Sequence, residues 1–323
     1  MSSPSSPPKS LQPPSSVFGL SKAVLFQSVS HCKQHFRVFV VIVIVLALPL
    51  SLLTSSLISA SHPIKSRIHL LHFIASQADV GFEARQAWRE AREYALSLIR
   101  LKFMYFVPCS ILSLVVAIST VSSVAASYSH RAVDVKLALS AVRNHWFLPM
   151  VTSIFNYVVL IAYSLIPRMM VVMAGGEMLK MMFWFLGLGI EVYLVTVMSM
   201  AMVVSIVEDH SGWDAMLIGS KLIEGRRLCG LVLCSSMMLM TGAIVHRMES
   251  FLTGERVMWT RFSGWMTLKV KRQPWRWEWS GLACLYAVLV VWGYILTTIL
   301  YCECRKRQAI SRDITGDEED LEL

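Results

Sequence analysis

The chain has 323 residues, of which 55% are hydrophobic and only 16% are charged, and its mean hydropathy is +0.57. This composition excludes a soluble domain built around one core of similar length, and it favours a single helical membrane domain. The net charge of +9 would suggest nucleic acid in a soluble protein, but here the cations lie at the ends of apolar stretches beside aromatic residues, so we expect anionic lipid headgroups as partners and no nucleic acid.

Six stretches of roughly twenty apolar residues follow one another along the chain. They cover residues 38–60, 101–127, 147–166, 181–207, 228–245 and 281–301. A bilayer core about 30 Å thick needs about 20 residues of helix, and backbone in lipid must satisfy its own hydrogen bonds, so each stretch predicts a spanning helix. The predicted fold class is all-α: a polytopic membrane protein with six transmembrane helices and amphipathic interfacial helices, in one membrane domain over residues 17–307.

The segment before the first span divides into two parts. Residues 1–16 are dominated by Ser and Pro, which predicts a disordered tail. Residues 17–37 place apolar side chains at helical spacing beside basic ones, which predicts a helix lying in the headgroup plane and leading into the first span. The first 37 residues are also basic, rich in Ser and free of acidic residues, as transit peptides are, so a plastid envelope is the alternative location.

The loop between the first two spans, residues 61–100, is long enough to hold a helix. Between residues 79 and 100, small and apolar side chains line one side and charged side chains occupy the others. The pattern predicts a second interfacial helix. A solvated charged helix that joins the two spans is the alternative.

Two further loops have recognisable patterns. Ser211 and Asp214 form a capping-box pattern, and Gly225 stands before two arginines, which predicts a short helix over residues 212–224. The last loop, residues 246–280, mixes five tryptophans with cations, which indicates a membrane interface, with an aromatic ligand-binding surface as the alternative. Lys and Arg are divided almost evenly between the two sides of the membrane, so charge does not decide the orientation.

Two cysteines follow the last span directly. Cys302 and Cys304 stand before Arg305-Lys306-Arg307, a position suited to S-palmitoylation, as is that of Cys32. The same positions fit inert thiols, so both interpretations stay open. Their spacing is one residue short of a zinc knuckle and no second pair exists, so we expect no metal site. Residues 308–323 predict an acidic, disordered tail, whose Asp-x-Glu pattern resembles export signals read by vesicle coats.

Glu191 is the only acidic residue well inside a predicted span. An ionisable group at the bilayer centre costs at least about 2.5 kcal/mol, so it suggests a function and requires a partner. If Arg168 and Lys180 mark the same end of an antiparallel hairpin, Asn156 and Glu191 lie about 16–18 Å along their helices and meet at one depth. The sequence therefore predicts an intramembrane pair of Glu191 and Asn156.

This pair has two interpretations. A protonated Glu191 could donate to Asn156 and hold the helices together, while a solvated Glu191 could bind a cation or move a proton. Gly187 and Gly189 would let the two helices approach closely in either case.

The loop after the fourth predicted span has a recognisable signature sequence. It reads Val204-Ser-Ile-Val-Glu208 followed by Gly212, Ala215, Ser220 and Gly225, and Asp214 lies within it. Together with the entry into the first span around Pro49, the segment 141–156 and the exit through Cys302 and Cys304, this loop resembles an uncharacterised plant family of six-span membrane proteins. The resemblance implies six helices, both termini in the cytosol, a remote likeness to bacterial membrane domains, and no activity. Some relatives bear a label about binding a poly(A)-binding protein, but neither tail has a peptide of the kind that would support it here.

No catalytic motif stands out in the sequence, so we expect no enzyme and no cofactor. The leading hypothesis is a non-enzymatic component of membrane organisation or trafficking, in the endomembrane system or the plasma membrane, whose partner is a bilayer with anionic headgroups and whose protein partners the sequence does not reveal. The alternative is a small-solute or ion carrier or channel that uses Glu191 and Asn156.

Overall fold

A computed structural model describes residues 17–77, 81–129, 135–173, 175–224, 227–253 and 276–319. These residues form helices and no strands, which confirms the predicted all-α class. Six of the helices are long and apolar enough to cross a membrane: Phe36–Ala75, Arg85–Tyr128, Phe147–Val171, Glu177–Val207, Arg227–Phe251 and Glu278–Ala309. Each contains one of the six predicted spans, so their positions along the chain are compatible with an integral multi-pass membrane protein.

The chain divides into two units, and the first comprises residues 1–39, 118–237 and 292–323. In chain order it contains α1 (Val17–Gln34), the start of α2 (Phe36–Ile42), the end of α4 (Gly81–Tyr128), α5 (Val135–Asn144), α6 (Phe147–Met173), α7 (Glu177–Val207), α8 (Gly212–Ile223), the start of α9 (Arg227–Thr253) and the end of α10 (Arg276–Glu319). The core of this unit combines Ile118 of α4, Met200 and Val204 of α7, and Ile299 and Leu300 of α10, all almost fully buried. In the same core, Gly230 of α9 lies against Thr196 and Leu300, and an added Cβ would lie 3.1 Å from Thr196 Cγ2.

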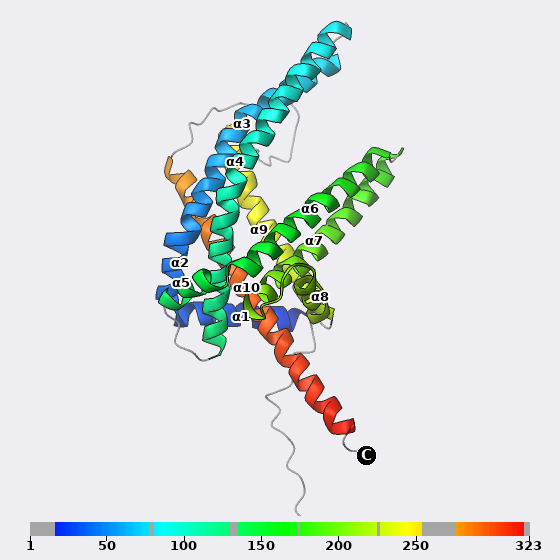
Figure 1. Cartoon of the computed structure of the whole chain (residues 1–323). Helices are drawn as coiled ribbons and strands as arrows, with labels where there is room; N and C mark the ends of the chain where they lie inside the picture. Colours follow the sequence, from blue (N-terminus) through cyan, green and yellow to red (C-terminus); the bar gives the residue numbers. More distant parts are fainter. Residues whose placement is uncertain are drawn as a thin grey trace, which may run out of the picture. The chain divides into compact units, whose positions relative to one another are not determined.

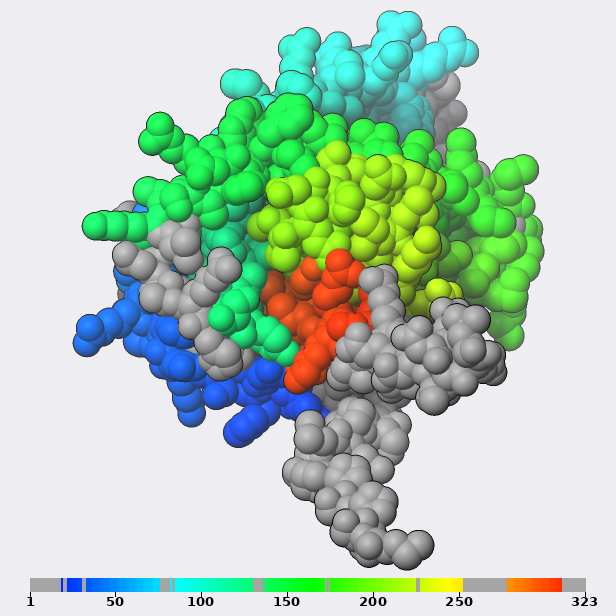
Figure 2. Space-filling model, turned by 60° about the horizontal axis from the view of Figure 1, so that its bottom comes forward, coloured from blue at the N-terminus to red at the C-terminus, as the bar shows by residue number. Residues whose placement is uncertain are grey.

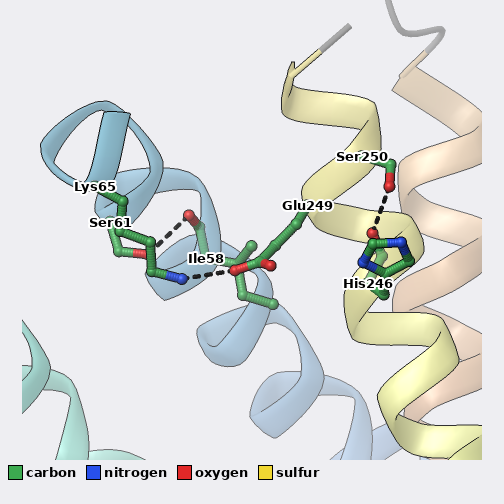
Figure 3. Close-up of polar contacts among 6 residues, drawn as sticks. All are labelled: Ile58, Ser61, Lys65, His246, Glu249 and Ser250. Atoms are coloured by element: carbon green, nitrogen blue, oxygen red, sulfur yellow. Dashed lines mark hydrogen bonds and ion pairs between the residues drawn. The ribbon is translucent and has the colours of Figure 1, made fainter. Parts of the chain in front are cut away.

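The second unit comprises residues 40–117 and 238–291. Its first span is continuous helix: α2 (Phe36–Ile42) passes through a π-helical turn, Val43–Ala47, into α3 (Leu48–Gln77). The wide turn comes directly before Pro49, whose missing N–H would interrupt an α-helical ladder. α3 is joined to α9 by an ion pair between Lys65 and Glu249, with Nζ and Oε1 2.6 Å apart (Figure 3).

The loop at residues 61–100 does not form a separate interfacial helix as predicted. α3 continues through Pro63 to Gln77, and α4 is one helix from Gly81, so the two run side by side as an antiparallel hairpin (Figure 1). His72 meets Trp88 edge to face at 5.1 Å between ring centroids, and the Arg67 guanidinium lies 6.0 Å from the Tyr94 ring centroid. These contacts between aromatic and cationic side chains explain why the small residues Ala87 and Ala91 are buried: their side of α4 faces α3.

The structure differs from the prediction for the C-terminal tail, contains a helix where one was predicted over residues 17–37, and does not describe most of the last loop. α10 continues to Glu319, whereas we predicted a disordered tail from residue 308; the segment has no proline to end the helix. The Ser/Pro tail at 1–16 and most of the tryptophan-rich loop, residues 254–275, lie outside the described residues. The helix predicted over 17–37 appears as α1, and Trp292 of α10 donates from Nε1 to Ser28 Oγ at 3.2 Å.

Candidate functional site

The loop from Glu208 to Ser211 turns the chain sharply between α7 and α8. Asp209 has φ of 55° and Gly212 has φ of 57°, both in the left-handed region. Asp tolerates this region better than most residues, and Gly enters it at no steric cost. The residue types of the signature therefore fit the turn that returns α8 onto α7.

The first turn of α8 is tied to α6. The N–H of Gly212 donates to Thr152 Oγ1 at 3.0 Å, and Thr152 is fully buried. The predicted capping box is not formed: Ser211 is the N-cap with extended backbone, but its side chain makes no capping hydrogen bond. A tertiary contact thus satisfies one of the free amides at this helix end. The helix itself, Gly212–Ile223, matches the predicted range closely.

Glu208 joins α7 to α10. Its carboxylate accepts a hydrogen bond from the Tyr301 hydroxyl and pairs with Arg305, whose Nε lies 2.9 Å from Oε1. The Glu208 side chain is only 13% exposed. Tyr301 and Arg305 are four residues apart on α10, so both reach the same carboxylate from one face of the helix. Burial of this charge is offset by a cation and a hydroxyl donor together.

Two neighbouring contacts extend this arrangement within the first unit. Tyr128, at the end of α4, donates to Glu303 Oε1 at 3.2 Å, and His145 Nδ1 lies 3.3 Å from Asp209 Oδ1. We call Thr152, Glu208, Asp209, Tyr301 and Arg305 the α7–α8 polar cluster. Figure 2 shows the face on which α10 (orange-red) lies between α8 (yellow-green), the end of α4 (teal) and α1 (blue). The cluster fixes helix ends to one another, and among the described residues no group of three His, Cys, Asp or Glu side chains is placed to hold a metal ion.

Glu191 and Asn156 are not brought together. Asn156 donates from Nδ2 to Met198 O at 3.3 Å, seven residues along α7 from Glu191, and its Oδ1 is buried without a hydrogen-bond partner among the described residues. The side chain of Glu191 is exposed on α7. The predicted direct pair is therefore not formed in this structure.

The register of the α6–α7 hairpin explains the difference. Pro167 packs on Gly187, and eleven residues separate Pro167 from Asn156 as well as Gly187 from Met198. In that register Glu191 lies level with Tyr163. Our prediction assumed that Arg168 ends its helix, but α6 continues to Met173. Of the two glycines, Gly187 makes the close approach, whereas a Cβ added at Gly189 would meet no atom within 4 Å.

The remaining predicted residues are dispersed along the first unit. Ala215 is fully buried, Asp214 is exposed, and Ser220 donates to Leu217 O within α8 at 2.9 Å. Gly225 lies outside the described residues. Cys304 is buried and Cys302 half-buried on α10, and Cys32 lies in α1, with its side chain outside the described part of the chain.

A small groove lies between α7 and α8. Its volume is about 170 Å³, and its walls are Tyr193, Leu194 and Val197 of α7 with Trp213, Met216, Leu217 and Ser220 of α8. Gly219 allows this crossing, because a Cβ there would lie 3.1 Å from Ala201 N. The ring of Trp213 is held edge to face against Phe155 of α6, with centroids 6.1 Å apart.

Sequence reasoning missed Thr152, Tyr301 and Arg305 as members of the cluster. The sequence offered a reason to predict Tyr301 and Arg305, because a phenol and a guanidinium four residues apart at the end of a span can share one carboxylate. Thr152 had no such signal, because its role depends on the crossing of α6 and the start of α8.

The comparisons with known proteins give one match. A family model described as Domain of unknown function (DUF8558) matches residues 17–318. No curated protein and no solved structure matches the chain. The matched range includes all six apolar helices, α8 and the polar cluster.

Proposed function

The chain belongs to the DUF8558 family, and from this membership, which brings no activity with it, we propose a function on physical grounds alone. We propose that the protein is an integral, multi-pass membrane protein that organises membranes or serves membrane trafficking without catalysing a reaction. Its location is the endomembrane system or the plasma membrane, with both termini in the cytosol and a plastid envelope as the alternative. The partner is the lipid bilayer itself.

The observation that supports this proposal is the two-sided environment of α8. One side packs on the protein, where Ala215, Gly219 and Leu222 are buried. The other side leaves Trp213 60% exposed and Leu217 42% exposed. A short helix with an aromatic and an aliphatic side chain outside the protein, at the end of a span, has the character of a helix that rests in the headgroup region.

A matched pair of double variants tests the role of α8. Trp213→Ala with Leu217→Ala removes the apolar face of α8, while Trp184→Ala with Leu188→Ala removes the same residue types at the same spacing from α7, where they are 57% and 41% exposed. The measurement is the diameter of vesicles after reconstitution at a fixed protein-to-lipid ratio. We expect vesicles with the wild type or the α7 variant to be smaller than protein-free vesicles. Vesicles with the α8 variant should have the same diameter as protein-free vesicles.

Vesicles of the same diameter with and without wild-type protein would contradict the proposal, as would equal effects of the two double variants. Size-exclusion chromatography in detergent is the folding control for both.

The competing proposal is a carrier or channel that uses Glu191 and Asn156. The separation of these residues leaves it without a shared site in this structure. Cysteines placed at position 191 and along its face of α7, in a chain without native cysteines, test it with a small water-soluble thiol reagent. Labelling along the whole face would support a water-filled path and the carrier, whereas uniform protection supports contact with lipid.

A further inference from the structure

The groove between α7 and α8 has an apolar wall. Only two lining side chains carry a polar atom besides the indole of Trp213, namely Tyr193 and Ser220, and the Ser220 hydroxyl already donates to Leu217 O. At about 170 Å³ the groove is smaller than the roughly 300–1,000 Å³ of sites that enclose a whole small molecule. Its shape and chemistry therefore fit one apolar segment of a longer molecule.

The walls of the groove are held in place by contacts that do not involve its occupant. Gly219 closes α8 onto Ala201 of α7 at one point, and Gly212 is anchored by Thr152 of α6. Trp213 is braced by Phe155, so its ring does not depend on a ligand for its position. The groove is thus preformed, which lowers the entropic cost of binding.

A cation lies at one end of the same helix face. Trp213, Leu217 and Lys221 follow one another at four-residue spacing, and all three are exposed. Lys221 has no ion pair among the described residues, because the nearby carboxylate of Glu224 pairs with Arg227 at 2.7 Å. From Leu217 to Lys221 the helix rises about 6 Å. An apolar wall followed by an exposed ammonium group is complementary to an acyl chain followed by a headgroup of net negative charge.

We propose that this groove binds one acyl chain of an anionic phospholipid, with the chain between Val197 and Leu217 and the net negative charge of the headgroup at Lys221. The proposal rests on the membrane location put forward above. It assigns α8 a specific lipid in addition to a general contact with the bilayer. Trp213 and Leu217 line the groove and are also exposed, so a chain can enter past them directly from the bilayer.

Photocrosslinking of the full chain in lipid nanodiscs tests the proposal. The probes are two phospholipids with the same diazirine-bearing acyl chain, one with a phosphatidylserine headgroup and one with phosphatidylcholine. We expect the phosphatidylserine probe to label the peptides that hold Val197 and Leu217 about fivefold more than the phosphatidylcholine probe, the difference expected for one lysine near a membrane surface.

Three variants test the apolar groove and the cation at Lys221 separately. Ser220→Phe fills the groove and should reduce labelling by both probes about tenfold, whereas Ser220→Ala leaves the groove open and should label like the wild type. Lys221→Gln should lower the phosphatidylserine labelling to the phosphatidylcholine level. Because Lys221 is exposed, this variant keeps the test decisive even if Ser220→Phe does not fold.

Equal labelling by the two probes in the wild type would overturn the proposal, and so would labelling that survives in folded Ser220→Phe. A crosslink between two copies of the chain through α8 would overturn it too, since a protein would then occupy the groove. Alkaline extraction separates this failure from that of the proposed function: a chain that leaves the membrane contradicts both, while a chain that stays but is unlabelled in the groove contradicts only the lipid site.

Discussion

Glu208, at the C-cap of α7, is the shared partner of two polar side chains of α10. Its carboxylate is largely removed from water, yet it accepts from Tyr301 and pairs with Arg305. A buried charge with these two partners is stable as a set, and removal of one partner leaves part of the carboxylate unsatisfied. The contribution of each partner can therefore be measured by single substitutions.

Tyr301→Phe removes the hydroxyl donor and keeps the ring. We expect the free energy of unfolding to fall by about 2 kcal/mol, because a hydrogen bond to a charged group is lost in a nearly buried place. Tyr105→Phe is the matched control, since Tyr105 is half-buried and makes no hydrogen bond to another described residue. Denaturant titration in detergent micelles measures both, and equal losses would show that the Tyr301 hydroxyl does not stabilise the fold through Glu208.

Gly187 and Gly189 differ in their surroundings although they lie on one helix. A Cβ at Gly187 would meet Pro167 Cβ at 3.0 Å, and the proline ring cannot rotate away, while Gly189 has open space around it. We expect Gly187→Ala to lower the free energy of unfolding by about 1–2 kcal/mol through overpacking. Gly189→Ala should raise it by up to about 1 kcal/mol through helix propensity. Thermal denaturation of the two variants gives the signs, and a shift in the same direction for both would refute the packing of α6 on α7.

At the scale of elements, α3 and α4 show how one loop becomes part of two long helices. Residues 61–77 and 82–100 contain no glycine and only one proline, Pro63, which lies within α3. The contacts of Arg67 with Tyr94 and of His72 with Trp88 have the constant register of an antiparallel hairpin. Residues 81–100 therefore pack against α3 as part of α4, and they do not form the separate interfacial helix that their amphipathic pattern suggested.

A pair of cysteines at positions 72 and 88 tests this hairpin. In a chain without native cysteines, a short bismaleimide should join them, because the side chains that they replace are in contact. The control pair is 72 and 96, since Leu96 lies eight residues, or about 12 Å, further along α4 and is exposed. Mass spectrometry of crosslinked peptides gives the yield. Efficient crosslinking of the control pair, or none at 72 and 88, would indicate that residues 79–100 lie apart from α3.

At the scale of the whole molecule, the number of apolar helices determines which segments share a side. Three candidate spans, α7, α9 and α10, separate Gly175 from Ala309, so an odd number of crossings should place these positions on opposite sides. Six crossings should place the two termini on the same side.

Cysteines introduced at Gly175 and Ala309, both at exposed positions, provide the test. In sealed vesicles of one orientation, a membrane-impermeant maleimide should label one of them only before the vesicles are opened and the other only afterwards. An epitope tag at the N-terminus should behave like position 309. Labelling of positions 175 and 309 from the same side would contradict the six-span arrangement.

The sequence by itself determined the six apolar helices, the all-α class and the short helix after Glu208. These properties depend on neighbours along the chain: a run of about 20 apolar residues satisfies its own backbone hydrogen bonds, and a glycine such as Gly212 can take the positive φ that starts a new helix after a turn. The predictions for these elements therefore agree with the structure in position and type.

The tertiary structure alone decided which turns of different helices meet. In the structure, Asn156 contacts Met198 instead of Glu191. The N–H of Gly212 donates to Thr152, and Tyr301 and Arg305 both bind the carboxylate of Glu208. The depth at which two helices face each other depends on packing such as that of Pro167 on Gly187, and a shift of two turns leaves the apolar pattern of each helix unchanged. Composition and periodicity do not record that register, so the polar contacts between helices follow only from the folded chain.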